Sequence, residues 1–282
     1  MLDEQLFYGS DYKYIPATSF LSGSGMEVLP DLYNFTIQIV NVQLIGHPDS
    51  KDFVLIDAGM PKSAEVIVEV VEERFGENSR PKAILLTHGH FDHVGAIVEL
   101  VKYWDIPVYA HELELPYLTG KESYPTPDWS VEGGLIAKMS PLFPVEPIHL
   151  GKYVQKLPDD GTVPHLPEFT WIHTPGHSPG HVSFFRENDR ALIVGDAFVT
   201  VRQDSLYKVL TQQHEINGPP RYLTTDWEAA KQSVQKLASL QPAVAVTGHG
   251  LPMTGDLLTS SLDRLVRDFD EIAIPDHGKY IN

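Results

Sequence analysis

Three histidines and an aspartate fall within six residues in the segment from His88 to His93. The segment Thr-His-Gly-His-Phe-Asp-His follows an apolar run, residues 83–86, that predicts a buried strand. Neutral imidazole nitrogens and a carboxylate oxygen suit zinc and similar divalent first-row metals as ligands. His88 and His90, two residues apart in an extended turn, can share one ion, and Asp92 and His93 are predicted to begin the next helix and face a neighbouring position. The pattern predicts a metal site with room for two ions.

Three later segments place a polar side chain in a similar way, at the end of an apolar run and beside glycine. His177 follows a predicted strand at 169–173, whereas Asp196 and His249 end two other predicted strands. Glycine at such points permits a tight approach of the backbone. Strand ends gathered at one edge of a sandwich would form a rigid, shallow metal cleft.

Charge and composition narrow the function classes. The 282 residues carry a formal net charge of −17, which argues against a nucleic-acid partner because phosphate backbones bind basic surfaces. The same charge disfavours docking to anionic lipid. The absence of cysteine excludes disulfides, thiolate ligands and a cysteine nucleophile. Residues 1–5 lack a signal-peptide pattern and no apolar run approaches ~18 residues, so we expect a cytoplasmic protein without a membrane partner.

Strand and helix signals cover most of the chain. The first signals are for strands, strands and helices then alternate, and the scheme recurs in the second half, which indicates two packed sheets with helices outside. Residues 112–168 are proline-rich and carry scattered aromatic residues, which predicts a cap-like insertion, and 199–225 is a second irregular stretch. Strands are predicted at 32–45 (one long strand or a hairpin arm), 53–57, 82–87, 108–110, 169–173, 181–186, 190–195 and 243–247, and helices at 63–75, 93–103, 226–240 and 256–273.

Taken in order, these motifs resemble those of the metallo-β-lactamase superfamily. The resemblance rests on H-x-H-x-D-H at 88–93, T-P-G-H at 174–177, G-D at 195–196 and G-H at 248–249, with the Asp57-Ala58-Gly59 turn upstream. It covers roughly residues 33–250. It implies an α+β fold, a four-layer αββα sandwich, in which residues 1–282 form a single domain with an insertion at about 112–168.

The resemblance also implies a dinuclear metal site. Two divalent ions are expected, zinc in the first place and iron or manganese as alternatives that a histidine and aspartate set also accepts. Asp92 is the expected catalytic residue, which would hand a proton to the leaving group while remaining a ligand. Carried over residue by residue, the family pattern gives one ion held by His88, His90 and His177, a second held by Asp92, His93 and His249, and Asp196 as the bridge.

Two further residues near these motifs have open roles. Asp57 is expected to orient a ligand imidazole, because ligating histidines usually require a partner at the other nitrogen; the alternative is a solvated turn aspartate. His181 lies four residues after His177. It would lie behind the ligands, face substrate, or replace His177 as the ligand, and the family pattern favours His177.

The implied activity is hydrolysis of an ester or lactone carbonyl by a hydroxide that bridges two metal ions. The aromatic insertion is similar to that of N-acyl-homoserine lactonases, which carry a tyrosine three residues after the bridging aspartate. Here that position is Val199, and Tyr207 or Tyr222 is the candidate to supply the hydroxyl.

A glyoxalase-II-like thioesterase is the alternative activity, because the segment 174–181 resembles that branch. Its glutathione-binding residues lie in a helical C-terminal domain for which too few residues follow His249. A non-catalytic metal-binding module is the third interpretation. In the two enzymatic cases the partner is a small-molecule ester, lactone or thioester. The apolar N-terminal segment, with Tyr14, Ile15, Pro16 and Phe20, is interpreted either as the arm of a homodimer or as packing on its own sandwich.

Overall fold

The computed structural model describes residues 6–13, 15, 18–132, 134–203, 206–212 and 214–281. The expectations for residues 1–5, Tyr14 and Pro16 lie outside these ranges. The chain divides into two compact units, Met1–Tyr124 with Pro144–Pro167, and Pro125–Phe143 with Glu168–Asn282. Within the described ranges, no helix has both the length and the apolar character needed to cross a membrane. That residues 1–282 form a single domain stays a prediction.

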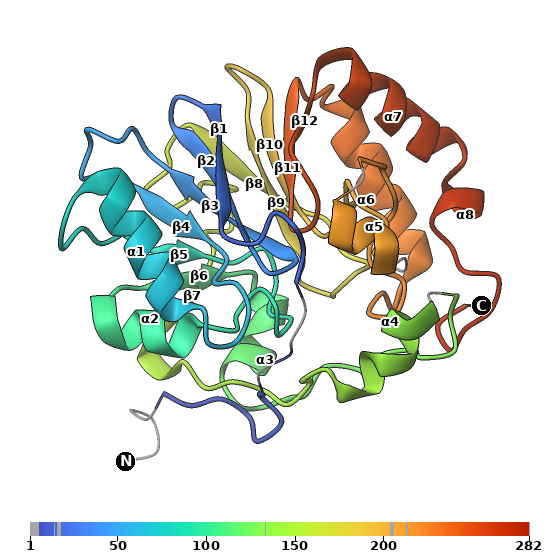
Figure 1. The fold of residues 1–282 in the computed structure, drawn as a ribbon, viewed down its shortest axis with the longest axis horizontal. Coiled ribbons are helices and arrows are strands. Elements are labelled where there is room, and N and C mark those ends of the chain that lie inside the picture. The colour runs from blue at the N-terminus through green and yellow to red at the C-terminus, as the bar shows by residue number, and fades with distance from the viewer. Residues whose placement is uncertain are drawn as a thin grey trace. The chain divides into compact units, whose positions relative to one another are not determined.

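A seven-stranded sheet forms the centre of the first unit (Figure 1), with its strands side by side in chain order. The pairings from β1 to β4 are antiparallel and those from β4 to β7 are parallel. The segment predicted at 32–45 is a hairpin of two strands. The strands are β1 (Ser24–Leu29), β2 (Leu32–Ile37), β3 (Val40–Ile45), β4 (Val54–Ile56), β5 (Ile84–Leu85), β6 (Val108–Ala110) and β7 (Val154–Lys156).

Two helices cover the parallel part of this sheet. Helix α1 (Ala64–Phe75) connects β4 to β5, and α2 (Ile97–Trp104) connects β5 to β6. Connections between parallel strands are right-handed, so both helices lie on one face of the sheet, and they lie together in Figure 1. Their buried residues include Val71 on α1 and Trp104 on α2. The loops that leave the carboxyl ends of β4 and β5 carry Asp57 and the histidine cluster.

Helix α2 begins at Ile97, so the prediction of a helix from residue 93 is wrong at its start. The carbonyl oxygen of His93 accepts the N–H of Ala58 at 2.6 Å, and the N–H of Ile97 instead bonds the carbonyl of Val94. Because the His93 carbonyl is used by the neighbouring loop, it does not accept the i+4 bond that would extend the helix. Residues 91–96 are turns and a bend.

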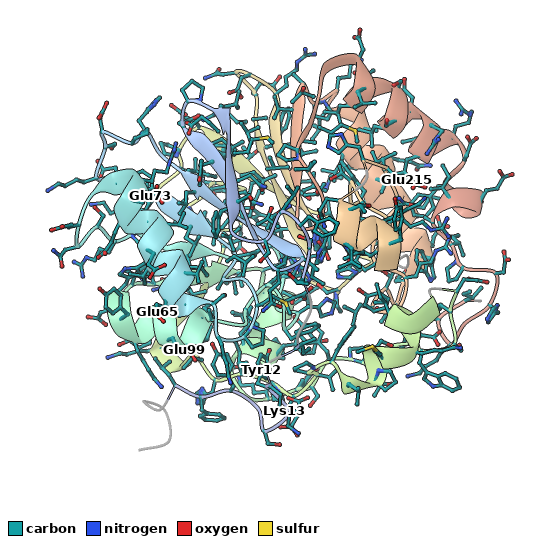
Figure 2. The ribbon with its side chains drawn as sticks, viewed as in Figure 1. Tyr12, Lys13, Glu65, Glu73, Glu99 and Glu215 are labelled. Carbon is teal, nitrogen blue, oxygen red and sulfur yellow. The ribbon has the colours of Figure 1, made fainter. Side chains whose placement is uncertain are left out.

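The N-terminal residues 6–13 pack on the first unit. The hydroxyl of Tyr8 donates to Glu99 on α2, and the ring of Tyr8 stacks on Tyr12 with 4.8 Å between centroids. Figure 2 labels Glu99 and Tyr12. These contacts involve residues that precede the apolar segment of Ile15 and Phe20, and Phe20 is 80% exposed. Both interpretations of that segment, as an arm or as packing on its own unit, stay predictions. A homodimer stays a prediction.

The irregular segment 112–168 contains only short elements, and its residues are divided between the two units. Its stretch 125–143 belongs to the second unit. The elements are η1 (Glu112–Glu114), α3 (Leu115–Leu118), η3 (Gly151–Tyr153) and β7 in the first unit, and α4 (Gly134–Met139) and η2 (Ser140–Leu142) in the second.

A five-stranded sheet forms the centre of the second unit (Figure 1), in the order β12-β11-β10-β9-β8. Strands β8, β9 and β10 form an antiparallel meander, and β11 runs parallel to β10. The pairing of β10 with β11 places Gly195 beside Thr247, so the loops that carry Asp196 and His249 leave the sheet together. The strands are β8 (Phe169–His173), β9 (Val182–Arg186), β10 (Ala191–Gly195), β11 (Val244–Thr247) and β12 (Met253–Thr254).

Apolar side chains of the helices pack on this second sheet. Val234 on α6 and Leu262 on α7 belong to one buried cluster with Leu192 and Ala245 of the strands. The single helix predicted at 256–273 is wrong in one respect, because it is interrupted at Asp268. The helices that contribute to this cluster are α6 (Trp227–Ser239), α7 (Gly255–Arg267) and α8 (Phe269–Ile272), and α5 (Leu206–Thr211) is a further short helix of the same unit.

Gly95 is required where the turn before α2 packs against the loop after β4. A Cβ at residue 95 would lie 2.2 Å from the nitrogen of Pro61 and 2.3 Å from the carbonyl carbon of Met60. Because these are backbone atoms in a packed interior, we expect Gly95→Ala to lower the free energy of unfolding by about 3 kcal/mol or more. Urea unfolding measures this change.

A matched control is Gly161→Ala, at a position with φ +83° and nothing within 4 Å of the added Cβ. It should cost about 1–2 kcal/mol, from the left-handed backbone alone. A Gly95→Ala loss no larger than that of the control would contradict the packing argument.

Candidate metal centre

The predicted cluster from His88 to His93 lies in the loop that leaves β5. The side chains of His88, His90, Asp92 and His93 are all buried, none more than 6% exposed. The imidazole of His88 lies 4.7 Å from that of His90 and 4.2 Å from that of His93, measured between centroids. The first unit therefore brings these three predicted histidine ligands together and places Asp92 in the same loop. Buried polar groups are costly unless a hydrogen-bond partner or a metal ion compensates them.

Asp57, at the end of β4, orients this loop. Its Oδ1 accepts the N–H of Thr87 at 2.8 Å, and its Oδ2 contacts the Thr87 hydroxyl at 2.8 Å and Nδ1 of His93 at 2.7 Å. Because an ionised carboxylate only accepts hydrogen bonds, Nδ1 of His93 carries the proton. The lone pair of His93 is then on Nε2. The expected contact between Asp57 and an imidazole is confirmed, and the alternative of a solvated turn residue is wrong.

The hydroxyl of Thr87 fixes the tautomer of His88 in a similar way. Its proton is donated to Asp57, so its oxygen accepts from Nδ1 of His88, 3.0 Å away. This arrangement leaves the lone pair of His88 on Nε2, as in His93. Asp57 itself has φ +60°, a conformation that aspartate tolerates better than most residues. One carboxylate thus fixes the tautomer of two imidazoles.

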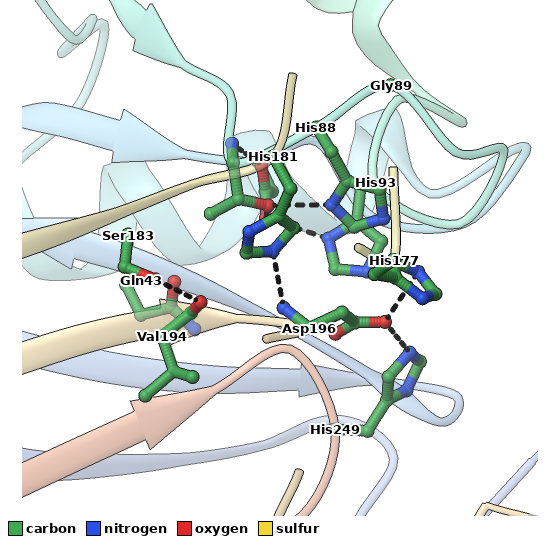
Figure 3. A network of polar contacts seen from close by, with 12 residues as sticks. Gln43, His88, Gly89, His93, His177, His181, Ser183, Val194, Asp196 and His249 are labelled. Atoms are coloured by element: carbon green, nitrogen blue, oxygen red, sulfur yellow. Dashed lines mark hydrogen bonds and ion pairs between the residues drawn. The ribbon is translucent and has the colours of Figure 1, made fainter. Parts of the chain in front are cut away.

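The second unit brings together His177, Asp196 and His249, which are at most 2% exposed. Oδ2 of Asp196 lies 3.5 Å from Nε2 of His177 and 3.3 Å from Nε2 of His249 (Figure 3). Charge-assisted hydrogen bonds between such groups are shorter, about 2.7–2.9 Å. Two ligand atoms that bind one tetrahedral metal ion at about 2.0–2.1 Å lie about 3.3–3.4 Å from each other. The spacing of the shared oxygen to both imidazoles therefore fits metal coordination.

The tautomer of His177 is fixed in the same way as that of His88. The hydroxyl of Thr224 donates to the carbonyl of Pro220 at 2.8 Å, so its oxygen accepts from Nδ1 of His177 at 3.1 Å. Nε2 of His177 is left with the lone pair, on the side of Asp196. Sequence reasoning missed Thr224, which lies 47 residues from His177 in the chain.

His181 is held by hydrogen bonds at both ring nitrogens, which resolves its open role. Its Nε2 accepts the backbone N–H of Asp196 at 2.8 Å, and its Nδ1 contacts the hydroxyl of Thr174 at 2.9 Å. Thr174 in turn contacts the hydroxyl of Ser183. The Ser183 hydroxyl donates to the carbonyl of Val194, as Figure 3 shows. The imidazole therefore has no nitrogen left for an ion, and it lies behind Asp196 as a support for the backbone of that residue.

The two tyrosines considered as hydroxyl donors lie in different surroundings. Tyr207 on α5 is 71% exposed, whereas Tyr222 is buried in an apolar cluster and contacts the ring of Phe143. Tyr124 is one of the scattered aromatic residues of the insertion, and the sequence did not predict its contact with the histidine cluster. Its ring lies 4.5 Å from that of His90. Burial and the neighbouring carboxylate of Glu114 raise the pKa of Tyr124 well above the usual value for a phenol.

Tyr12 reaches the neighbourhood of the histidine cluster from the N-terminal segment. Burial raises the pKa of Tyr12, and the charges of Asp11 and Asp92 raise it further. The hydroxyl therefore stays protonated across the physiological range. The sequence offers no local signal for this placement, because about 80 residues separate Tyr12 from Asp92.

The donor sets of both units fit divalent metal ions. Imidazole nitrogens and carboxylate oxygens are acceptable to zinc, iron and manganese. In His88, His93 and His177 the nitrogen that does not face the donor cluster is held by a hydrogen bond, which is the usual outer support of a metal ligand.

Comparison with known proteins agrees with these features. Residues 36–249 match the family described as "Metallo-beta-lactamase superfamily". A protein of Bacillus subtilis (strain 168), named "Probable metallo-hydrolase YflN", is 51% identical over 260 residues, which cover 92% of this chain and 98% of that protein. The "Hydroxyacylglutathione hydrolase GloC" of Haemophilus influenzae is 30% identical over 148 residues, 52% of this chain and 62% of that protein.

A solved structure, that of TTHA1623 in a di-iron-bound form, is similar with a TM-score of 0.52 and 31% sequence identity. The similarity covers 79% of this chain and 93% of that one. The α+β fold with two sheets and outer helices is therefore of the type predicted from the sequence. Since the family match extends over most of the chain and includes every motif from Asp57 to His249, the protein belongs to the metallo-β-lactamase superfamily.

Proposed function

We propose that the protein is a hydrolase with two divalent metal ions that cleaves an ester or lactone carbonyl. The observation that carries the proposal is the Oδ2 atom of Asp196, which lies 3.5 Å and 3.3 Å from the Nε2 atoms of His177 and His249. One oxygen at coordination spacing from two imidazoles is what a bridging ligand requires. Membership of the superfamily and the relative named a probable metallo-hydrolase support the same activity.

The proposed ligand set has seven residues, all buried. Zinc is the metal we propose, and iron is the alternative because the similar TTHA1623 was solved in a di-iron-bound form. Two bound ions would supply a nucleophilic hydroxide near neutral pH and polarise the scissile carbonyl. The first ion is assigned to His88, His90 and His177, the second to Asp92, His93 and His249, and Asp196 to both.

The residues of the chain have distinct tasks in this proposal. Asp57 and Thr87 hold the lone pairs of His93 and His88 on Nε2, the nitrogen proposed to bind the ion. Asp92 is proposed to accept the proton of the hydroxide once it has added to the carbonyl, and to pass that proton to the leaving group while remaining a ligand. These side chains are buried. Burial lowers the effective dielectric constant around them, which strengthens electrostatic interactions within the site.

Two observations bear on the substrate. The aromatic residues of the insertion at 112–168 support an ester or lactone with an apolar part. Binding sites for small molecules are lined mainly by apolar and aromatic side chains. The similarity to a hydroxyacylglutathione hydrolase favours a thioester as the second candidate. Both substrates react at a carbonyl and would use the same seven residues, so the choice between them is made by assay.

One prediction from the proposed function concerns substrate class. We expect the metal-loaded protein to hydrolyse acyl lactones. Asp92→Ala should lower kcat/KM by at least about 100-fold, because it removes a proposed metal ligand together with the proposed proton-transfer group, and the loss of proton transfer alone costs about 10²–10⁴-fold. The measurement compares acyl lactones, lactoylglutathione and a simple phosphodiester at equal protein and metal concentrations.

Turnover of lactoylglutathione alone would replace the lactone assignment with the thioester candidate. Two bound metal ions without turnover of any of the three would contradict the hydrolase proposal in favour of a non-catalytic metal-binding module. Full activity of Asp92→Ala would refute the proposed role of that residue.

A second prediction follows from the hydrogen bonds of Asp57. Asp57→Asn keeps the size of the side chain and tolerates φ +60°, yet it removes the charge that holds Nδ1 of His93 protonated. We expect the affinity for zinc to fall by about 10–100-fold. Competition between the metal-free protein and a chromophoric chelator measures it. The control is Asp52→Asn, whose carboxylate is exposed and pairs with Lys82; equal affinities for the two variants would contradict the assignment.

A further inference from the structure

Glu114 is a fully buried carboxylate that none of the proposed catalytic steps uses. It ends η1 in the irregular segment and has no exposed surface. Its Oε2 accepts the backbone N–H of Gly89 at 2.9 Å and also accepts the hydroxyl of Tyr124. A buried charge is costly unless donors surround it. The position of this buried carboxyl group, with Oε2 bonded to the backbone of the turn formed by His88, Gly89 and His90, therefore needs an explanation.

Tyr124 completes the contact with the same turn. Its hydroxyl oxygen lies 3.0 Å from the nitrogen of Gly89, whose N–H is shared between Tyr124 and Glu114. Its ring packs edge to face on His90 at 4.5 Å and stacks on Tyr117 at 3.9 Å. Tyr124 therefore contacts both the backbone and a side chain of the His88–Gly89–His90 turn.

Gly89 is the residue that allows this approach. A Cβ at position 89 would lie 2.6 Å from the hydroxyl oxygen of Tyr124 and 3.1 Å from Cδ2 of Leu118. The N–H of Gly89 can donate to both Glu114 and Tyr124 only because no side chain occupies the space at residue 89. Figure 3 shows Gly89 directly beyond His88 in this loop.

We propose that Glu114 and Tyr124 are positioning residues that fix the His88–Gly89–His90 turn and thereby raise its affinity for a metal ion. The inference rests on the proposed function, in which His88 and His90 bind one ion. Two imidazoles joined by a single glycine lose backbone freedom when they bind one ion. The hydrogen bonds to Gly89 restrict that freedom before the metal arrives, which is the physical basis of preorganisation.

The test uses the full chain in its metal-free form, with cobalt(II) as the probe. Tyr124→Phe removes the hydroxyl and keeps the ring contacts with His90 and Tyr117, and Glu114→Gln removes the charge at nearly constant size. The matched control is Tyr117→Phe, which keeps the stacked ring beside Tyr124. Competition with a chelator measures the cobalt affinity, and hydrogen exchange measures the protection of the Gly89 amide.

Tyr124→Phe and Glu114→Gln should each lower the cobalt affinity by about tenfold or more. The Gly89 amide should also exchange at least about tenfold faster in the metal-free protein. Tyr117→Phe should match the wild type in both measurements. Faster exchange with unchanged affinity would overturn the proposal, because the pair would then only anchor the insertion.

Unchanged exchange in both variants would overturn it as well. A wild-type protein that binds no cobalt would instead contradict the proposed function and, with it, the claim on affinity. If Tyr124→Phe does not fold, Glu114→Gln decides by the same two measurements, and failure of both to fold while Tyr117→Phe folds would assign the pair to folding and overturn the proposal.

Discussion

The hydrogen bonds of the Asp57 carboxylate are the interaction on which the candidate centre depends most. Asp57 ends a central strand, and its two oxygens reach the backbone and hydroxyl of Thr87 and the ring of His93. A carboxylate buried to 1% exposure is stable only when donors surround it. The same contacts that satisfy Asp57 determine which nitrogen of each imidazole carries the proton. The stability of the strand ends and the chemistry of the ligands are therefore set by one group.

The second unit uses the same principle with different residues. His181 holds the backbone of Asp196, and Thr224 holds the ring of His177. The result is an Asp196 side chain whose Oδ2 lies at nearly equal distances from two imidazole nitrogens. In both units, hydroxyl groups relay hydrogen bonds in one direction, from an imidazole to a carbonyl or carboxylate. Such relays fix tautomers without adding charge.

The sequence predicted the elements that deliver the ligands because each of them is an apolar run that ends in a polar residue. Strands β5, β10 and β11 are short and completely buried, so their composition is distinctive. The first strand, β1, was not predicted because its residues are largely exposed and its pattern carries little apolar signal. The start of α2 was misplaced because a tertiary hydrogen bond, from Ala58 to His93, decides it.

The supporting residues of the site were harder to predict than the ligands. Thr87 adjoins a ligand in the sequence and could have been identified from that position alone. Glu114 lies in the sequence Glu-Leu-Glu, which reads as an ordinary exposed turn of helix, and only the fold brings it to Gly89. Thr224 and Tyr124 are likewise distant from the ligands that they contact. Periodicity reports burial, whereas these roles depend on contacts between distant segments.

The central claim is that one oxygen of Asp196 is shared by two metal ions. A crystal structure of the zinc-loaded protein, with anomalous scattering measured at the zinc edge, tests it directly. The account predicts two anomalous peaks about 3.5–4 Å apart, each about 2.0–2.2 Å from the same Oδ2 atom of Asp196. A single peak, or two peaks of which only one lies within bonding distance of Asp196, would contradict the account.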